Sequence, residues 1–324
     1  MPKRFPWAFL CLCAVLSGLA SYCPAAQRAY TRLVVLSDPH LPGQNVAQKT
    51  KVLETVNKWK DVNAVALTGD ITETAGTEAE YAFAKKFFAK LKKPIYPIAG
   101  NHDYIYGLDP DGKMRKGTPA ERQAKLKLFQ DTFNLPATHY AKKFGRYLCL
   151  FISNDDLDSD LLTVMSSATL SWLQDELQGS PDAPTIIFFH APLEGTIQSE
   201  NEVSGRPSFF AQPADLLREL LRRNPQVFMW VSGHTHIAAT NARFADRKIN
   251  LYDGRVAEIH NSDMDGRSYL SDKDHGTTSH DTIWIDSLFL YQDKVVVKTY
   301  DHKKKSWLKA LTREIRPPTP KKQP

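Results

Sequence analysis

Seven side chains with nitrogen or oxygen donor atoms lie in five short clusters that could together bind two metal ions. The clusters are Asp38-Pro39-His40, Gly69-Asp70, Gly100-Asn101-His102-Asp103, His190 and Gly233-His234-Thr235-His236. Imidazole nitrogens with carboxylate and amide oxygens, and no thiolate, suit Mn, Fe or Zn better than Ca. A lone carboxylate such as Asp70 can bridge two cations because it has two oxygens. The ligands we expect are Asp38, His40, Asp70, Asn101, His190, His234 and His236.

The charge of such a site indicates its substrate. Two carboxylates leave two divalent cations with an excess of positive charge, which favours an anionic substrate such as a phosphoester. A metal pair about 3.5–4 Å apart can polarise phosphoryl oxygens and produce a metal-bound hydroxide at neutral pH. The donor set therefore predicts hydrolysis of a phosphoester.

Each cluster directly follows a short apolar run. These runs cover residues 32–37, 62–68, 94–99, 185–189 and 227–232. Short apolar runs that end at Gly, Pro or Asp are typical of buried strands, and α/β sheets place their sites at the carboxyl ends of strands. Taken alone, Asp38 could cap a helix and His190 could be a hydrogen-bonded core histidine. Neither reading predicts five clusters at five strand ends.

The rest of the pattern indicates a mostly parallel α/β sheet in a single domain, residues 27–302. Helical periodicity alternates with the strands, at residues 46–59, 79–91, 120–133, 168–177 and 213–222. Residues 282–290 and 294–300 are expected to form an antiparallel pair. Residues 104–116 and 194–206 are expected to form loops over the mouth of the site, where Tyr104 or Tyr106 could stack on a substrate ring.

Residues 1–26 are typical of a signal peptide. Lys3 and Arg4 precede an apolar run, residues 7–20, that is too short for a comfortable membrane span. Cleavage is expected near residues 20–26, after Ala20 or close to Ala25, and an uncleaved signal anchor is the alternative. We therefore expect an exported protein, periplasmic or secreted.

The formal charge of +6 is unevenly distributed along the chain. Lys3 and Arg4 contribute +2 and residues 303–324 contribute +7, which leaves about −3 for the part between. The mildly acidic body gives no basic stripe for nucleic acid. Residues 303–324 are expected to be a solvated basic, Pro-rich tail. The more specific alternative is that this tail makes weak contact with an anionic surface.

The five clusters, in this order, resemble those of the calcineurin-like metallophosphoesterase superfamily, and the resemblance covers residues 33–300. It implies a four-layer α/β/β/α sandwich of two mixed sheets with a dinuclear metal site at the strand carboxyl ends. It further implies two ligand sets: Asp38, His40, Asp70 and His236 for one metal, and Asp70, Asn101, His190 and His234 for the other. His102 would contact the phosphate and protonate the leaving oxygen, and Asp103 would orient the His102 ring.

Differences between this sequence and two other branches of the superfamily narrow the choice of branch. Glu73 stands where purple acid phosphatases carry Tyr, and residues 71–74 lack the Asp-Arg-Gly element of Ser/Thr protein phosphatases. The motifs are most similar to those of class III cyclic-nucleotide phosphodiesterases. We therefore expect a phosphodiesterase, with 3',5'-cyclic nucleotides among its candidate substrates. A phosphomonoesterase that scavenges phosphate is the rival, and an inactive metal-binding module is disfavoured because His102 and Asp103 are both present.

Overall fold

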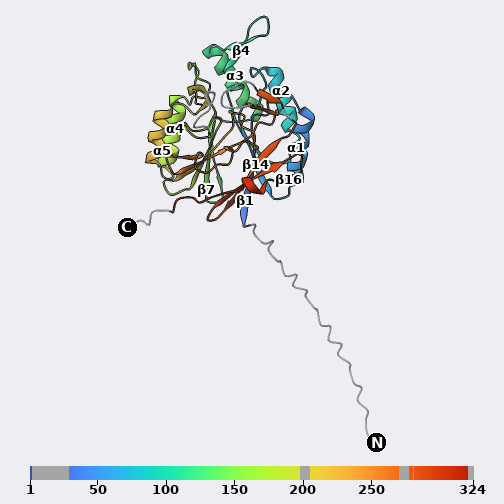
Figure 1. The fold of residues 1–324 in the computed structure, drawn as a ribbon, viewed down its shortest axis with the longest axis vertical. Helices are drawn as coiled ribbons and strands as arrows, with labels where there is room; N and C mark the ends of the chain where they lie inside the picture. The colour runs from blue at the N-terminus through green and yellow to red at the C-terminus, as the bar shows by residue number, and fades with distance from the viewer. Residues whose placement is uncertain (2–28, 198–204, 270–276, 280, 320–324) are drawn as a thin grey trace.

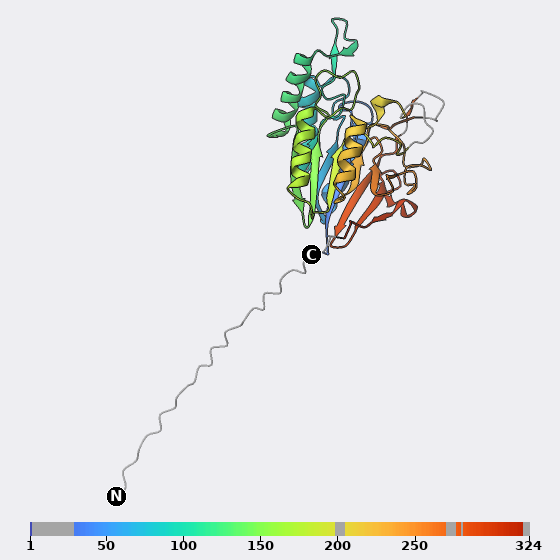
Figure 2. The same cartoon turned by 90° about the vertical axis from the view of Figure 1, so that its left-hand side faces the viewer.

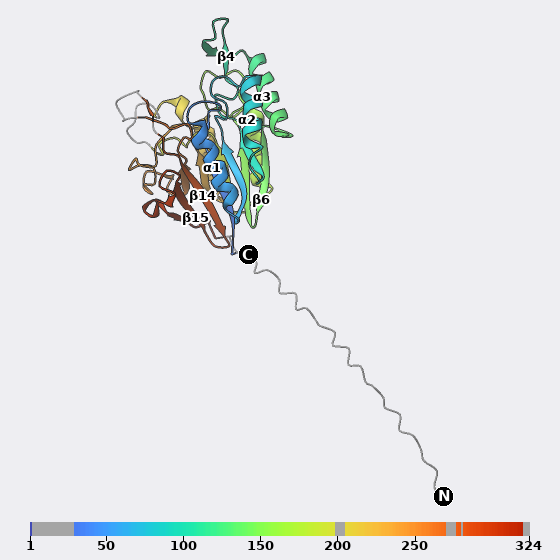
Figure 3. The same cartoon turned by 90° about the vertical axis from the view of Figure 1, so that its right-hand side faces the viewer.

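The computed structural model describes Met1 and residues 29–197, 205–269, 277–279 and 281–319. Apart from Met1, the expected signal peptide lies outside these ranges. Among the described residues, no helix has the length and apolar character needed to cross a membrane. Figures 1, 2 and 3 show a body of stacked layers from three directions.

The first sheet has the strand order β16-β15-β14-β1-β2-β3, and β17 also pairs with β15. Its strands are β1 (Tyr30–Leu36), β2 (Val62–Thr68), β3 (Ile95–Ile98), β14 (Trp284–Tyr291), β15 (Val295–Asp301), β16 (Ser306–Trp307) and β17 (Arg313–Ile315). The first three run parallel, so their carboxyl ends meet at one edge of the sheet. The predicted antiparallel pair is confirmed as β14 and β15.

The second sheet has the order β10-β11-β9-β8-β7-β6. Its strands are β6 (His139–Phe144), β7 (Tyr147–Ile152), β8 (Thr185–Phe189), β9 (Val227–Ser232), β10 (Leu251–Tyr252) and β11 (Val256–His260). The four central strands are parallel, and the two edge strands are antiparallel to their neighbours. Both sheets are therefore mixed.

Five α-helices cover the outer faces of the two sheets within the described residues. They are α1 (Val46–Lys58), α2 (Glu78–Phe88), α3 (Pro119–Phe133), α4 (Ser167–Gln178) and α5 (Ala214–Arg223), each within three residues of its predicted bounds. Thr77 and Thr118 begin α2 and α3 with reciprocal capping boxes. In Figure 1, α1 and α2 lie on one side of the strands and α4 and α5 on the other; Figures 3 and 2 face these two sides.

Successive side chains along each strand point to opposite faces of the sheet, and they fill three apolar layers. In β1, Val34 and Leu36 pack against the α1–α3 side, whereas Leu33 and Val35 join a cluster shared with the second sheet. In β8, Phe188 belongs to the same shared cluster, while its neighbours along the strand pack under α4 and α5. A period of two is what places both faces of each sheet in a core. The four-layer α/β/β/α sandwich is confirmed.

The boundary expected at residue 303 is wrong for part of the segment beyond it. β16 and β17 both pair with β15, and the 3₁₀ turn Lys309–Leu311 lies between them. Arg313 is buried and forms a 2.6 Å ion pair with Asp286 of β14. Residues 306–315 are therefore part of the first sheet, because edge pairing and a buried ion pair hold a segment whose composition alone suggests solvation.

The expected mouth loops contain short regular elements. Residues 104–116 include a hairpin of β4 (Tyr106–Leu108) and β5 (Met114–Lys116), at the top of Figure 1. In the second loop, residues 198–204 lie outside the described part of the chain, and the 3₁₀ turn Pro207–Phe209 follows. A further small pair, β12 (Arg267–Tyr269) and β13 (Thr277–Ser279), stands apart from the two main sheets.

Candidate metal centre

The structure brings the predicted ligands into two adjacent groups that share one residue. We name the first set metal group 1; its members are Asp38, His40, Asp70 and His236. Metal group 2 contains Asp70, His190 and His234, together with Asn101, whose Oδ1 lies 3.1 Å from Nε2 of His190. Within each Asp/His set, the donor atoms lie within 4.8 Å of one another. All seven predicted side chains therefore lie together, close to the carboxyl ends of the strands that precede them.

In metal group 1, ring nitrogens and carboxylate oxygens converge on a common point. Nε2 of His40 lies 3.4 Å from Nε2 of His236 and 3.9 Å from Oδ2 of Asp70. Nε2 of His236 lies 3.4 Å from Oδ1 of Asp38. Donor atoms that bind one cation at about 2.0–2.2 Å must lie roughly 3–4 Å apart. The spacing fits one small divalent ion.

Metal group 2 has the same character. Nε2 of His190 lies 3.2 Å from Oδ2 of Asp70, the same oxygen that faces His40. The other oxygen of Asp70 accepts a 2.8 Å hydrogen bond from the His102 amide. Asp70 is therefore oriented by the loop after β3 while its free edge faces both groups.

Three of the four ligand rings are oriented through their outer nitrogens. His190 donates from Nδ1 to the Thr68 carbonyl at 2.8 Å, and His234 donates from Nε2 to the Ser208 carbonyl at 2.9 Å. Nδ1 of His236 lies 3.1 Å from Oδ2 of Asp263. Such contacts fix the tautomer and leave the inner nitrogen free for a metal.

The backbone at the ligands adopts unusual conformations. Among the ten non-glycine residues with positive φ in the described chain, five are predicted ligands. Their φ values are 48° for Asp38, 40° for His40, 47° for Asp70, 70° for His234 and 50° for His236. Left-handed conformations of residues other than glycine cost free energy and cluster at functional sites. They turn these side chains inward directly after the strands.

Two glycines permit the close approach of the loops. A Cβ at Gly100 would lie 2.3 Å from Oδ1 of Asp70, and one at Gly233 would lie 2.2 Å from Oδ2 of Asp38. Both separations are too short for a side chain. Glycine at these positions therefore allows the backbone of one loop to pass directly against a ligand from another.

Burial and mutual charge shift the pKa values of the ligands. Burial raises the pKa of Asp70, but the charges of His190 and His102 outweigh it and hold the pKa well below its usual range. Burial lowers the pKa of His190, yet the Asp70 carboxylate raises it to about 9. Burial lowers the pKa of His234 to about 3. The centre thus contains an anionic carboxylate and at least one neutral imidazole, the forms that bind metals.

The expectation that Asp103 orients the His102 ring is wrong. Its carboxylate accepts hydrogen bonds from backbone amides of Gly100 at 2.7 Å, Thr72 at 2.9 Å and Ile71 at 3.2 Å. Nδ1 of His102 instead lies 3.2 Å from the Thr74 carbonyl. Asp103 therefore joins the loop after β2 to the loop after β3, and a backbone carbonyl orients the ring.

A cavity of about 180 Å³ opens on the two metal groups. It is lined by Asp70, Asn101, His102, Tyr106, Leu162, Phe209, His234, His236 and Arg267. Of the two tyrosines considered for substrate stacking, Tyr104 is buried in the core under the first sheet, whereas Tyr106 lines the cavity. Phe209 stacks on His234 with ring centroids 5.1 Å apart. The cavity lining thus combines aromatic and apolar side chains with polar groups.

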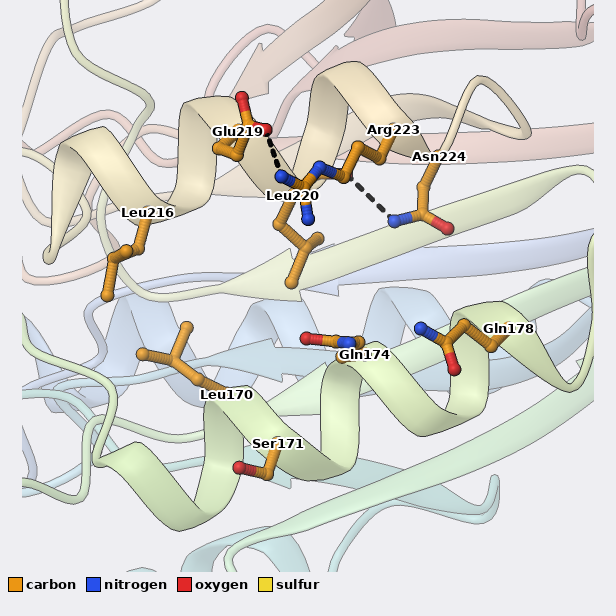
Figure 4. A pocket seen from close by; sticks show the side chains of 9 residues that line it. All are labelled: Leu170, Ser171, Gln174, Gln178, Leu216, Glu219, Leu220, Arg223 and Asn224. Carbon is orange, nitrogen blue, oxygen red and sulfur yellow. Dashed lines mark hydrogen bonds and ion pairs between the residues drawn. The ribbon is translucent and has the colours of Figure 1, made fainter.

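A second hollow, between α4 and α5, has a different composition (Figure 4). Leu170, Gln174 and Gln178 face it from α4, and Leu216 and Leu220 from α5. Its charged groups neutralise one another, because the lining residues Glu219 and Arg223 form a 2.5 Å ion pair. No predicted ligand lines it, and we interpret it as a seam between two helices.

Sequence analysis missed three residues that line the metal cavity, Leu162, Phe209 and Arg267, and also Asp263, which contacts His236. Asp263 lies three residues after β11, but that strand contains Glu258 and His260 and so gives no apolar-run signal. Arg267 and Phe209 come from short elements without an apolar run. Their placement depends on tertiary packing.

The geometry agrees with comparisons to known proteins. Residues 31–238 match the family described as calcineurin-like phosphoesterase. The chain is 25% identical over 228 residues to "Uncharacterized protein YvnB" of Bacillus subtilis, covering 66% of this chain and 16% of that protein. It is 26% identical over 227 residues to "Probable glycerophosphodiester phosphodiesterase GpdQ" of Arcobacter nitrofigilis, covering 64% and 72%. It is 25% identical over 177 residues to "3',5'-cyclic-nucleotide phosphodiesterase alr5338" of a Nostoc species, covering 54% and 56%.

Solved structures show the same fold. Purple acid phosphatase PPD1 from yellow lupin superimposes with a TM-score of 0.58 at 14% identity, over 86% of this chain and 53% of that one. A dimetal phosphatase from Danio rerio gives 0.55 at 13% identity, over 89% and 99%. The family match spans well over half of the chain, and the buried Asp/His cluster fits two divalent ions. The chain spans only 16% of the length of the first of these curated relatives and 53% of the lupin enzyme, but the family match alone shows that it belongs to the calcineurin-like phosphoesterase family.

Proposed function

We propose that this protein is an exported phosphodiesterase that uses two divalent metal ions, with Mn, Fe or Zn as the native metals. The observation that carries the proposal is the sharing of Asp70 between two convergent donor groups. Metal group 1 would hold one ion and metal group 2 the other. When bound, the ions supply Lewis-acid polarisation of the phosphoryl group and a hydroxide nucleophile.

The protein's own residues orient the substrate and move a proton. His102 lines the cavity, and its ring is held through Nδ1 by the Thr74 carbonyl, which leaves Nε2 to serve the leaving oxygen. Its amide meanwhile orients Asp70, so one residue contacts both the metal bridge and the substrate. Proton transfer by a positioned imidazole contributes about 10²–10⁴-fold to the rate of such reactions.

The cavity walls support a diester rather than a monoester. Tyr106, Leu162 and Phe209 contribute aromatic and apolar side chains to the walls, beside the polar groups of the metal centre. A diester carries a second organic group that such a wall can cover, whereas a monoester presents only charged oxygens on that side. Two relatives whose printed names are those of phosphodiesterases support the same class. Small phosphodiesters, 3',5'-cyclic nucleotides among them, are the proposed substrates.

The decisive experiment compares bis-p-nitrophenyl phosphate with p-nitrophenyl phosphate on the purified protein. Each is assayed after chelation and after reconstitution with Mn²⁺, Fe²⁺ or Zn²⁺. Metal-dependent turnover of the diester well above the monoester supports the proposal. Preference for the monoester would make the protein a phosphate-scavenging phosphatase. Absence of turnover with both metals bound would favour a metal-binding module.

Export is the second element of the proposal, and its support is the sequence of residues 1–26. Amino-terminal sequencing of protein recovered from the periplasm or medium tests it. A new terminus near residues 20–26 is expected, and a retained Met1 would contradict cleavage.

Contact of the carboxyl terminus with an anionic surface is proposed for Lys321 and Lys322, because Arg313, Arg316 and Lys303 already form ion pairs with carboxylates of this chain. Sedimentation of the protein with anionic vesicles, compared with a chain ending at residue 316, tests this contact. We expect the full chain to bind more, and equal binding by both chains would contradict it.

A further inference from the structure

One cationic side chain lines the metal cavity without belonging to either metal group. Arg267 begins β12, a few residues after β11, and its side chain is 25% exposed. It contributes to the same cavity as His102, Tyr106 and Phe209. Its positive charge lowers the pKa of both His40 and His102, alongside the larger effect of burial. The guanidinium therefore acts electrostatically on the site.

Each carboxylate beside Arg267 also contacts another group. Oδ1 of Asp265 forms an ion pair with the buried Lys49 and accepts a 2.7 Å hydrogen bond from the Gln44 amide. Oδ2 of Asp263 lies 3.1 Å from Nδ1 of His236. Nε of Arg267 lies 3.3 Å from Asp265 Oδ2 and 3.7 Å from Asp263 Oδ2.

These two ion pairs balance the charge of the guanidinium but do not supply hydrogen bonds to all of its N–H groups. Nε and Nη2 of Arg267 are buried and form no hydrogen bond with the part of the chain that the structure describes. Buried donors without partners are costly and rare in folded proteins. At the edge of a cavity, such donors are best explained by a ligand that accepts their hydrogen bonds.

The chemistry of the missing acceptor follows from the donor. A guanidinium presents a rigid planar fork that matches the oxygens of phosphate or carboxylate. The cavity it lines is the one in which the metal groups suit a phosphoester. We propose that Arg267 is a substrate-binding residue that holds a non-bridging oxygen of the phosphoryl group; this inference rests on the function proposed above.

A purely structural role is the competing explanation. Arg267 could simply support Asp263, which in turn contacts the His236 ring. That role predicts loss of metal on substitution. Substrate binding predicts weaker binding of phosphate with the metals retained. Phosphate affinity measured beside metal content separates the two.

The experiment titrates inorganic phosphate calorimetrically into the full chain reconstituted with Mn²⁺. R267Q removes the positive charge and keeps much of the side-chain volume. R267K keeps the charge but lacks the planar guanidinium group. R247Q is the matched control, because Arg247 is exposed and does not line the metal cavity. Metal content and melting temperature are measured for every variant.

We expect R267Q to bind phosphate about 10- to 100-fold more weakly than wild type, the effect of losing charge-assisted hydrogen bonds. Its metal content and melting temperature should match those of wild type, and R247Q should bind phosphate normally. Wild-type phosphate affinity in R267Q would overturn the inference.

If R267Q loses metal or melts lower, R267K decides the question. Retained metal with weakened phosphate binding in R267K supports the inference. Lost metal or undiminished phosphate binding in R267K overturns it. Failure of the proposed function is distinguishable: a wild-type protein that binds phosphate through Arg267 but hydrolyses neither ester contradicts that function alone.

Discussion

The two metal groups share Asp70 but differ in what holds their ligands. In metal group 2, the rings of His190 and His234 donate to backbone carbonyls of Thr68 and Ser208. In metal group 1, side chains contribute to the outer contacts: Asp263 lies against His236, and Ser37 donates to Asp38, which also accepts from the His234 amide. The rings of metal group 2 are oriented by the path of the chain, whereas metal group 1 also depends on replaceable side chains.

This difference indicates where the centre is vulnerable to substitution. A backbone carbonyl is present whatever residue supplies it, so metal group 2 depends on the fold of the loops. Metal group 1 depends on the identity of particular residues. Substitutions around the ligands should therefore affect the first group more than the second, while changes at shared residues should affect both.

The largest effect is expected at the residue that both groups share. D70N removes one anionic oxygen from each group, so both metals should be lost and activity should fall about 10³-fold or more. Metal analysis by mass spectrometry with the diester assay checks this outcome. D215N, at a side chain that is 95% exposed, is the control. Two bound metals in D70N would contradict the bridging role.

The next effect is expected at His102, whose ring belongs to neither group. H102A should retain both metals and lower kcat about 10²–10⁴-fold, because it removes a proton donor and not a ligand. Metal content and steady-state kinetics on one preparation make the measurement. Unchanged kcat would exclude His102 from the mechanism, and loss of metal would mean that the ring also stabilises the centre.

A smaller effect should separate the two groups directly. D263N weakens the acceptor beside His236 and should reduce the affinity of one metal about 10–100-fold. S208A should leave both metals in place, because His234 contacts the Ser208 carbonyl and not its side chain. Chelator competition measures both variants, with D253N as an exposed carboxylate control. Equal metal affinity in all three would remove the distinction between the groups.

The smallest effect is expected at Glu258, whose side chain connects two segments that lie next to the ligands His190 and His234. Glu258 accepts hydrogen bonds from Ser232 Oγ at 2.5 Å and from the Leu193 amide at 3.1 Å. Burial raises the pKa of Glu258 from 4.5 to about 8. The folded state therefore holds this proton more tightly than the unfolded state does. The resulting stability is complete below about pH 4.5 and is lost as the pH rises through about 8.

Denaturant unfolding at pH 6 and pH 9 tests this dependence. Wild type should lose about 1–3 kcal/mol of unfolding free energy over this interval from Glu258 alone. E258Q cannot ionise and should lose that much less. Parallel pH profiles for the two proteins would show that Glu258 does not titrate as described.

Much of the site could be predicted because its signal is local. Each ligand loop follows an apolar run, and side-chain alternation within those runs gives both the strands and the layers. The roles of Asp103 and Thr74 could not be predicted in this way. They depend on which backbone amides and carbonyls from separate loops meet in space, and the side-chain sequence does not encode that meeting locally.

The carboxyl-terminal strands escaped prediction for a related reason. β16 and β17 are short edge strands in a lysine- and arginine-rich segment. Their stability comes from pairing with β15 and from the Arg313–Asp286 ion pair, both tertiary contacts. Arg267 belongs to the same class, because only the folded structure places it beside the cavity.

The left-handed ligands have a consequence for the stability of this chain. Five residues in that conformation cost roughly 1–3 kcal/mol each, a sum comparable to the whole stability of a typical domain. Glycine at any of them would relieve strain and abolish a ligand. Aspartate and histidine at all five positions therefore provide metal ligands at the expense of ease of folding.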